Sequence, residues 1–115
     1  MQIEIQARDF SLTNALRDYI KRRLDFALRR RDNHIQRVMV RVSDINGPRG
    51  GQDKSCQIHI VLPKASVVVE DIKSNLYKAI DRAAGRARQS IDRHLTRRRK
   101  KSRAPGVTDL ITVDM

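Results

Sequence analysis

The chain has 115 residues, a length typical of one domain, and its 25 Lys and Arg residues against 13 Asp and Glu give a net charge of +12. Its one cysteine, Cys56, excludes an intramolecular disulfide framework, and no apolar run is long enough to span a bilayer. The first residues lack a signal-peptide pattern, so we expect a cytoplasmic protein whose partner is a polyanion, and no membrane association.

The positive charge is concentrated at the two ends of the chain. Residues 1–31 carry a net charge of +4, residues 32–72 carry none, and residues 73–115 carry +8. This distribution predicts that the middle of the chain is scaffold and that the two ends form the binding surface.

The first half of the chain predicts a strand, a helix and a second strand. Residues 2–8 alternate between polar and apolar side chains, the period of a half-buried strand. Residues 12–30 carry apolar side chains at intervals of three and four, which predicts an amphipathic helix capped by Ser11 or Thr13. Alternation resumes over residues 35–45 and indicates the second strand.

The second half predicts two more strands and a long helix. Residues 46–51 are rich in glycine and proline, which predicts a hairpin loop, and strands are expected over residues 56–62 and 67–70. Residues 74–99 show helical spacing with a narrow, alanine-rich apolar stripe. The basic tail, residues 100–115, has no extended pattern, and we expect it to be flexible.

The element order is therefore β-α-β-β-β-α, which predicts an α+β fold. Such a chain forms a four-stranded, largely antiparallel sheet with both helices packed on one face. We expect one binding domain over residues 1–99, followed by the tail.

Basic residues recur along one side of each predicted helix. Arg17 and Lys21 share a side of the first helix, and a cluster at residues 29–31 extends the positive surface. The two helices are expected to lie side by side. We therefore expect these groups and the basic residues of the second helix to clamp a phosphate backbone together. On the second helix the residues at intervals of three or four along one side form what we call the ladder: Lys78, Arg82, Arg86, Gln89, Arg93 and Arg97.

The alternative interpretation of these cations is a solvated helix face that keeps the protein soluble. Between residues 73 and 103, however, only Asp81 and Asp92 oppose the basic groups, too few for neutralising pairs within the helix. A bound polyanion would relieve that repulsion, so we favour nucleic-acid binding. Aromatic residues are few and fall mostly on or near apolar helix faces, which predicts recognition of RNA shape and backbone with little base stacking.

No catalytic or metal-binding constellation is visible in the sequence. Cys56 and His59 are three apart on a predicted strand, so their side chains point to opposite faces, and Cys56 is expected in the core. His34, His59 and His94 fall on three different elements without further ligands at metal spacing. We therefore expect no enzyme, no metal, no cofactor and no small-molecule substrate.

Several short motifs, taken in their order along the chain, resemble those of the ribosome hibernation-promoting factors. This family is also called the ribosome-associated inhibitors or the sigma-54 modulation protein family. The likeness extends from Met1 to about Leu95. The motifs that carry it are Ile3-x-Ile5, Leu12-Thr13-x-Ala15-Leu16-Arg17, Val38-x-Val40, and Tyr77-Lys78-Ala79-Ile80-Asp81 followed by Arg88-Gln89.

The resemblance implies a fold similar to double-stranded RNA-binding domains and a position between the head and body of the small ribosomal subunit. A short-form member there would exclude mRNA and tRNA, inhibiting translation as a hibernation factor. The family's rRNA contacts are implied for Arg17, Lys21, Lys78, Arg82, Arg86 and Arg93.

The chain departs from the family in a longer loop at residues 47–54 and in its basic tail, which lacks the dimerisation domain of the long form. We expect a monomer off the ribosome, and whether it pairs two ribosomes or silences single ones stays open. Two alternatives also stay open: a general double-stranded RNA-binding module and a sigma-factor-linked transcription modulator.

Overall fold

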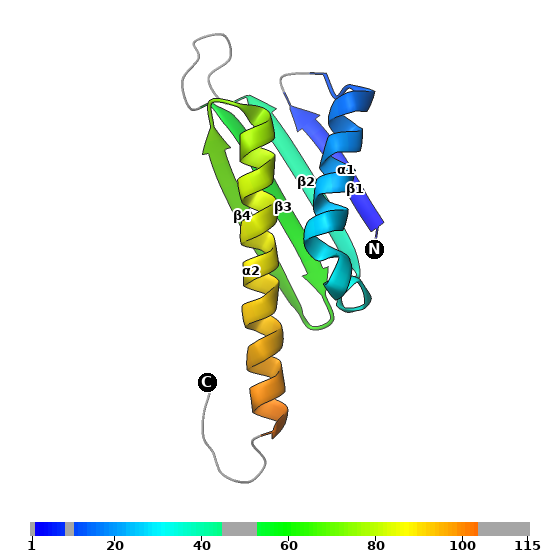
Figure 1. Ribbon diagram of the computed structural model, residues 1–115, viewed down its shortest axis with the longest axis vertical. Helices are drawn as coiled ribbons and strands as arrows, with labels where there is room; N and C mark the ends of the chain where they lie inside the picture. Colours follow the sequence, from blue (N-terminus) through cyan, green and yellow to red (C-terminus); the bar gives the residue numbers. More distant parts are fainter. Residues whose placement is uncertain (1, 9–10, 45–52, 104–115) are drawn as a thin grey trace.

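One four-stranded sheet with two helices on a single face makes up the fold (Figure 1). The computed structural model describes residues 2–8, 11–44 and 53–103, with side chains described up to residue 97. The predicted β-α-β-β-β-α order and the α+β class are confirmed, with one short 3₁₀ helix added. The elements are β1 (Gln2–Arg8), α1 (Asn14–Leu28), the 3₁₀ helix η1 (Arg29–His34), β2 (Arg37–Asp44), β3 (Lys54–Leu62), β4 (Ala65–Lys73) and α2 (Leu76–Arg103).

The strands lie in the order β1-β2-β3-β4, with β1 parallel to β2 and the other two pairs antiparallel. Alternation decides which side chains meet the helices, because successive residues of a strand point to opposite faces. Val38, Val40 and Val42 of β2 and Cys56, Ile58 and Ile60 of β3 are buried in the core. None of the described helices covers the other face (Figure 1).

The β3–β4 hairpin turns through Pro63 and Lys64, since Leu62 pairs with Ala65. Lys64 has a φ of 69°, the left-handed region that side chains other than glycine's seldom adopt. β4 is longer than the predicted strand at residues 67–70, because its polar last residues continue the register with β3 as far as Lys73. The predicted hairpin loop at residues 46–51 lies outside the described residues.

Helix α1 begins where Thr13 caps it, with the hydroxyl oxygen accepting a hydrogen bond from the Leu16 amide at 3.1 Å. The helix ends at Leu28, two residues before the predicted end, and the chain continues as η1. The Ile35 amide then donates to the Asp32 carbonyl and leads into the extended chain before β2. The apolar side of α1 buries Leu16, Ile20, Leu24, Ala27 and Leu28.

Helix α2 lies across β3 and β4 and extends beyond the end of the sheet (Figure 1). Its stripe of Ala79, Ala83, Ala84 and Ala87 is fully buried, so small side chains bring the helix close to the strands. The helix runs to Arg103, past the predicted end at residue 99. The division into a domain at 1–99 and a tail stays a prediction, and the tail from residue 104 lies outside the described residues. No described helix is both long and apolar enough to cross a membrane.

Candidate nucleic-acid interface

The predicted ladder on α2 is exposed along its whole described length. Lys78, Arg82, Arg86, Gln89, Arg93 and Arg97 all have exposed side chains. Within the described part of the chain, Lys78 and Arg97 form no ion pair, and Arg93 donates only to the Ser90 hydroxyl at 3.2 Å. These three cations are therefore available to an external anion.

Arg82 and Arg86 differ from the other ladder residues because an acidic residue of β4 contacts both. The Asp71 carboxylate lies 3.6 Å from Nε of Arg82 and 4.0 Å from Nη1 of Arg86. Arg86 also donates to the Glu70 backbone carbonyl at 2.6 Å. Helical spacing did not reveal this partner, which the fold brings from the neighbouring strand. The two arginines thus lean toward the sheet edge and are partly neutralised.

Arg17 and Lys21 are exposed as predicted, but the structure does not place them beside the ladder. The α1 side chains of Tyr19 and Arg23 donate hydrogen bonds to Asp81 of α2, so this side of α1 faces α2. Residues two positions away point about 200° around a helix, so Arg17 and Lys21 lie on the flank of α1 away from α2. The cations therefore form two flanks with the inter-helix seam between them, and their joint contact with one phosphate backbone stays a prediction.

Two ion-pair clusters hold the seam between the helices together. Tyr19 Oη donates to Asp81 Oδ1 at 2.5 Å, and Arg23 Nε donates to the same oxygen at 3.1 Å. The hydrogen bond to the Asp81 carboxylate is the main cause that raises the pKa of Tyr19 above its ordinary value, followed by burial. Asp81, one of the two acidic residues of α2 considered in the sequence, thus has its partners on another element.

The second cluster joins η1 to α2 through a bidentate ion pair. Arg31 donates from Nε and Nη2 to the two carboxylate oxygens of Asp92, at 2.5 and 2.8 Å. Hydrogen bonding to Asp92 raises the pKa of Arg31, so this guanidinium stays charged. Arg88 lies 3.9 Å from Asp92 on the same helix. The arrangement fixes Arg31, the last residue of the cluster at residues 29–31, against α2.

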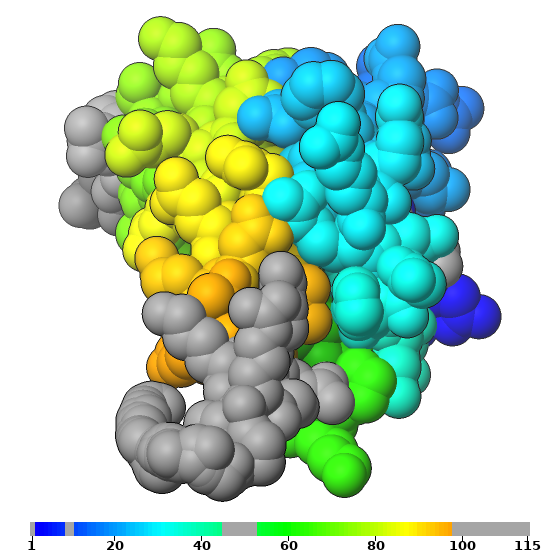
Figure 2. Space-filling model, turned by 60° about the horizontal axis from the view of Figure 1, so that its bottom comes forward, coloured from blue at the N-terminus to red at the C-terminus, as the bar shows by residue number. Residues whose placement is uncertain are grey.

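An arginine-lined groove of about 510 Å³ opens along this seam. Figure 2 shows the surface of α1 and η1, in cyan, meeting that of α2, in yellow. The sequence had indicated the cluster at residues 29–31 but neither Arg23 nor Arg88, because only the packing of the helices brings them together. We call this feature the arginine groove; its lining is Arg23, Phe26, Ala27, Arg29, Arg30, Arg31, Gly85 and Arg88.

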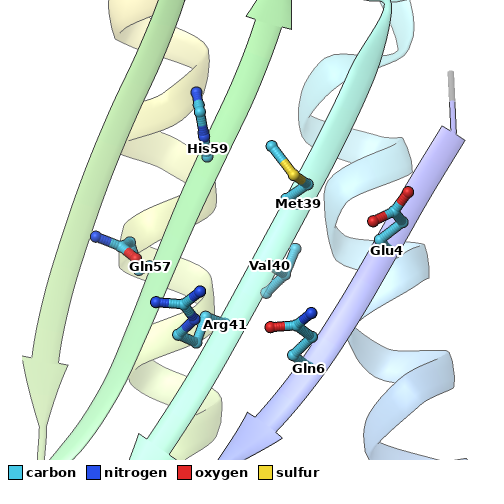
Figure 3. A pocket seen from close by; sticks show the side chains of 7 residues that line it. All are labelled: Glu4, Gln6, Met39, Val40, Arg41, Gln57 and His59. Carbon is cyan, nitrogen blue, oxygen red and sulfur yellow. The ribbon is translucent and has the colours of Figure 1, made fainter.

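The uncovered face of the sheet has a hollow of about 120 Å³ (Figure 3). Met39 lies between Glu4 and His59 in the strand register, so this carboxylate and imidazole are held apart. Cys56 is buried on the opposite face, where desolvation and, to a lesser extent, the Asp71 charge raise its pKa to about 12. A thiol held neutral in this way is a poor nucleophile. Among the described residues, no three His, Cys, Asp or Glu side chains cluster as metal ligands.

Comparison with known proteins identifies the family. The family described as "Sigma 54 modulation protein / S30EA ribosomal protein" matches residues 3–99. The N-terminal domain of Protein Y from Thermus thermophilus is 30% identical, with a TM-score of 0.68 over 82% of this chain and 99% of that one.

A ribosomal subunit interface protein from Coxiella burnetii has a TM-score of 0.74 over 84% of this chain and 99% of its own, and its 16% identity supports the fold alone. A search of curated protein sequences gives no significant match. With nearly the whole folded part of the chain matched, the protein belongs to the sigma-54 modulation protein / S30EA ribosomal protein family.

Proposed function

We propose that this protein binds the rRNA of the small ribosomal subunit through its helix layer and occupies the mRNA and tRNA channel, acting as a hibernation factor. Membership of a family whose description names a ribosomal protein supports association with ribosomes. The observation that carries the proposal is the set of cations on α2 that no described acidic residue neutralises: Lys78, Arg93 and Arg97.

Inhibition by occupancy requires no chemistry from the protein. A body that fills the channel excludes mRNA and tRNA by volume, and phosphate contacts hold it in place. This agrees with a site made of guanidinium and ammonium groups and with a thiol, Cys56, that is buried. The proposal includes a cytoplasmic location, a monomer off the ribosome, and no cofactor or small-molecule substrate.

The site residues proposed to contact rRNA are the seven cations identified from the sequence. Because they lie on two flanks, the RNA must follow the helix layer from the side of α1 to the side of α2 to reach them all. The curved, folded surface of rRNA suits this arrangement better than one straight duplex groove. The residues are Arg17, Lys21, Lys78, Arg82, Arg86, Arg93 and Arg97.

The test compares two matched charge reversals by cosedimentation with small subunits. Arg82 and Arg86 are unsuitable, because glutamates there would face Asp71 and disturb the fold. Lys78→Glu with Arg97→Glu changes only cations without ion pairs in the described residues, and should lower the magnitude of the salt slope by about 1.5 to 2.

The control is Arg8→Glu with Arg41→Glu, the same charge change on the uncovered face of the sheet. This variant should bind nearly as well as the wild type, and circular dichroism should show both variants folded. Pre-bound mRNA and tRNA should prevent binding of the wild type. Equal losses in both variants, or binding beside tRNA, would argue against the proposed surface and channel.

A further inference from the structure

Phe26 is the most exposed of the large hydrophobic side chains that the structure describes, with 73% of its surface accessible. The sequence predicts that most aromatic residues lie on or near apolar helix faces, and Phe26 is not one of these. The ring lies instead at the arginine groove, which it helps to line. An aromatic face open to solvent beside a cationic groove is the combination that binds unpaired nucleotides.

The ring is flanked by a guanidinium that is itself anchored. Arg23 Cζ lies 5.9 Å from the centroid of the Phe26 ring, within the range of a cation–π contact. Arg23 is held from its other side by Asp81, so it stays beside the ring. Because the ring remains mostly accessible, this contact leaves room for a flat ligand.

The groove beside the ring keeps a surplus of positive charge. Five arginines line it, and the carboxylates that contact them are Asp25 on Arg29, Asp81 on Arg23, and Asp92 on Arg31 and Arg88. Arg30 has no ion pair with any described residue. An anion entering the groove therefore meets one unopposed guanidinium and others only partly neutralised.

Gly85 gives the groove its open floor. A Cβ added at this position meets no atom within 4 Å, so the space above the helix backbone is empty. Glycine in a helix interior is less favourable than alanine. Gly85 therefore leaves space in the groove and lowers the stability of the helix. Gly85 thus lines the same groove as the Phe26 ring and the arginines.

We propose that Phe26 and the arginine groove hold one unpaired nucleotide of RNA, its base stacked on the ring and its phosphate among the arginines with Arg30 foremost. This rests on the proposed function and deepens it, because it adds a single-stranded contact to the phosphate contacts of the two flanks. Paired bases inside a duplex cannot stack on a protein ring, whereas bases in loops and bulges can. The site thus distinguishes folded RNA that presents an unpaired base from a plain duplex.

The test measures binding of a short RNA hairpin with an unpaired loop and of a blunt duplex with the same number of phosphates, by fluorescence anisotropy. Phe26→Leu keeps apolar bulk and removes the aromatic face. It should weaken hairpin binding roughly five- to a hundred-fold and leave duplex binding unchanged. Tyr77→Leu, the matched control at an aromatic residue 43% exposed, should leave both affinities nearly unchanged.

A second variant tests the groove without relying on the ring. Gly85→Leu should raise the thermal stability, because leucine is a better helix former, while it lowers hairpin affinity by filling the groove. Equal affinity of Phe26→Leu and wild type for the hairpin, or equal losses for hairpin and duplex, would overturn the proposed nucleotide site. Small-subunit cosedimentation of the wild type separates the two proposals, since it can succeed while the nucleotide site fails.

Discussion

Asp71 limits how much of the α2 ladder is available to RNA, and Asp71→Asn should therefore strengthen binding. Its carboxylate, only 12% exposed, lies 3.6 Å from Arg82 and 4.0 Å from Arg86. Both arginine side chains are more than half exposed, so Arg82 can turn toward a phosphate once the carboxylate charge is removed, while Arg86 keeps its hydrogen bond to the Glu70 carbonyl. Asparagine keeps the shape of the side chain and removes only the charge.

The size of the effect follows from the geometry. Ion pairs this long to exposed arginines contribute about 0.2 to 1 kcal/mol each, so losing both should lower the free energy of unfolding by about 0.4 to 2 kcal/mol. One additional phosphate contact steepens the salt dependence by about 0.9 and raises the affinity about eightfold at roughly 0.1 M salt. The gain should shrink as the salt concentration rises toward 1 M.

The assay is a salt titration of binding to small subunits, with thermal unfolding measured on the same preparations. The account predicts tighter binding, a steeper slope and a small loss of stability for Asp71→Asn. Weaker binding with an unchanged slope would refute the reasoning, because it would mean that Asp71 orients the two arginines for RNA.

Three further predictions concern the scaffold. The pKa of Cys56 is raised to about 12 from 9.0, so at pH 8 it should have about a thousand-fold less thiolate than an unfolded thiol, and thiol reagents should label it only in denaturant. The contribution of Cys56 to stability is complete below pH 9 and is lost as the pH rises toward 12. Lys64→Gly should raise stability by about 0.5 to 1 kcal/mol in calorimetry, because glycine adopts the positive φ without strain, and a loss would contradict this. Tyr19→Phe should lower stability by about 0.5 to 1.5 kcal/mol through the lost hydrogen bond to Asp81. Because the folded-state pKa of Tyr19 is raised, the difference from wild type should be constant below pH 10 and shrink as pH rises through the raised pKa, and denaturant titrations at several pH values would detect it.

The fold could be predicted because its strands follow a period of two residues and its helices a period of three to four residues. Alternation marked the strands and their buried faces, and spacing by three and four marked both helices. The ends of the elements were less accurate where tertiary contacts decide them. β4 continues to Lys73 because β3 provides hydrogen-bonding partners that the polar sequence Glu70-Asp71 gives no reason to expect.

The exposure of the ladder was also predictable, whereas its partners and its neighbours were not. The helical spacing of the apolar residues alone predicts that Lys78 and Arg97 face solvent, but it carries no information about which strand lies beside a helix. Asp71 reaches Arg82 only through the fold. The orientation of one helix about its axis relative to the other likewise separates Arg17 from the ladder, and it leaves Phe26 at the groove.

The central claim, that a cationic helix layer grips rRNA of the small subunit, is tested most directly by the affinity of wild-type protein for purified small subunits across a salt series. With about six phosphates neutralised, log affinity should fall against log salt with a slope of about −4 to −5. Failure to bind small subunits even in dilute buffer, or an affinity independent of salt, would contradict the account.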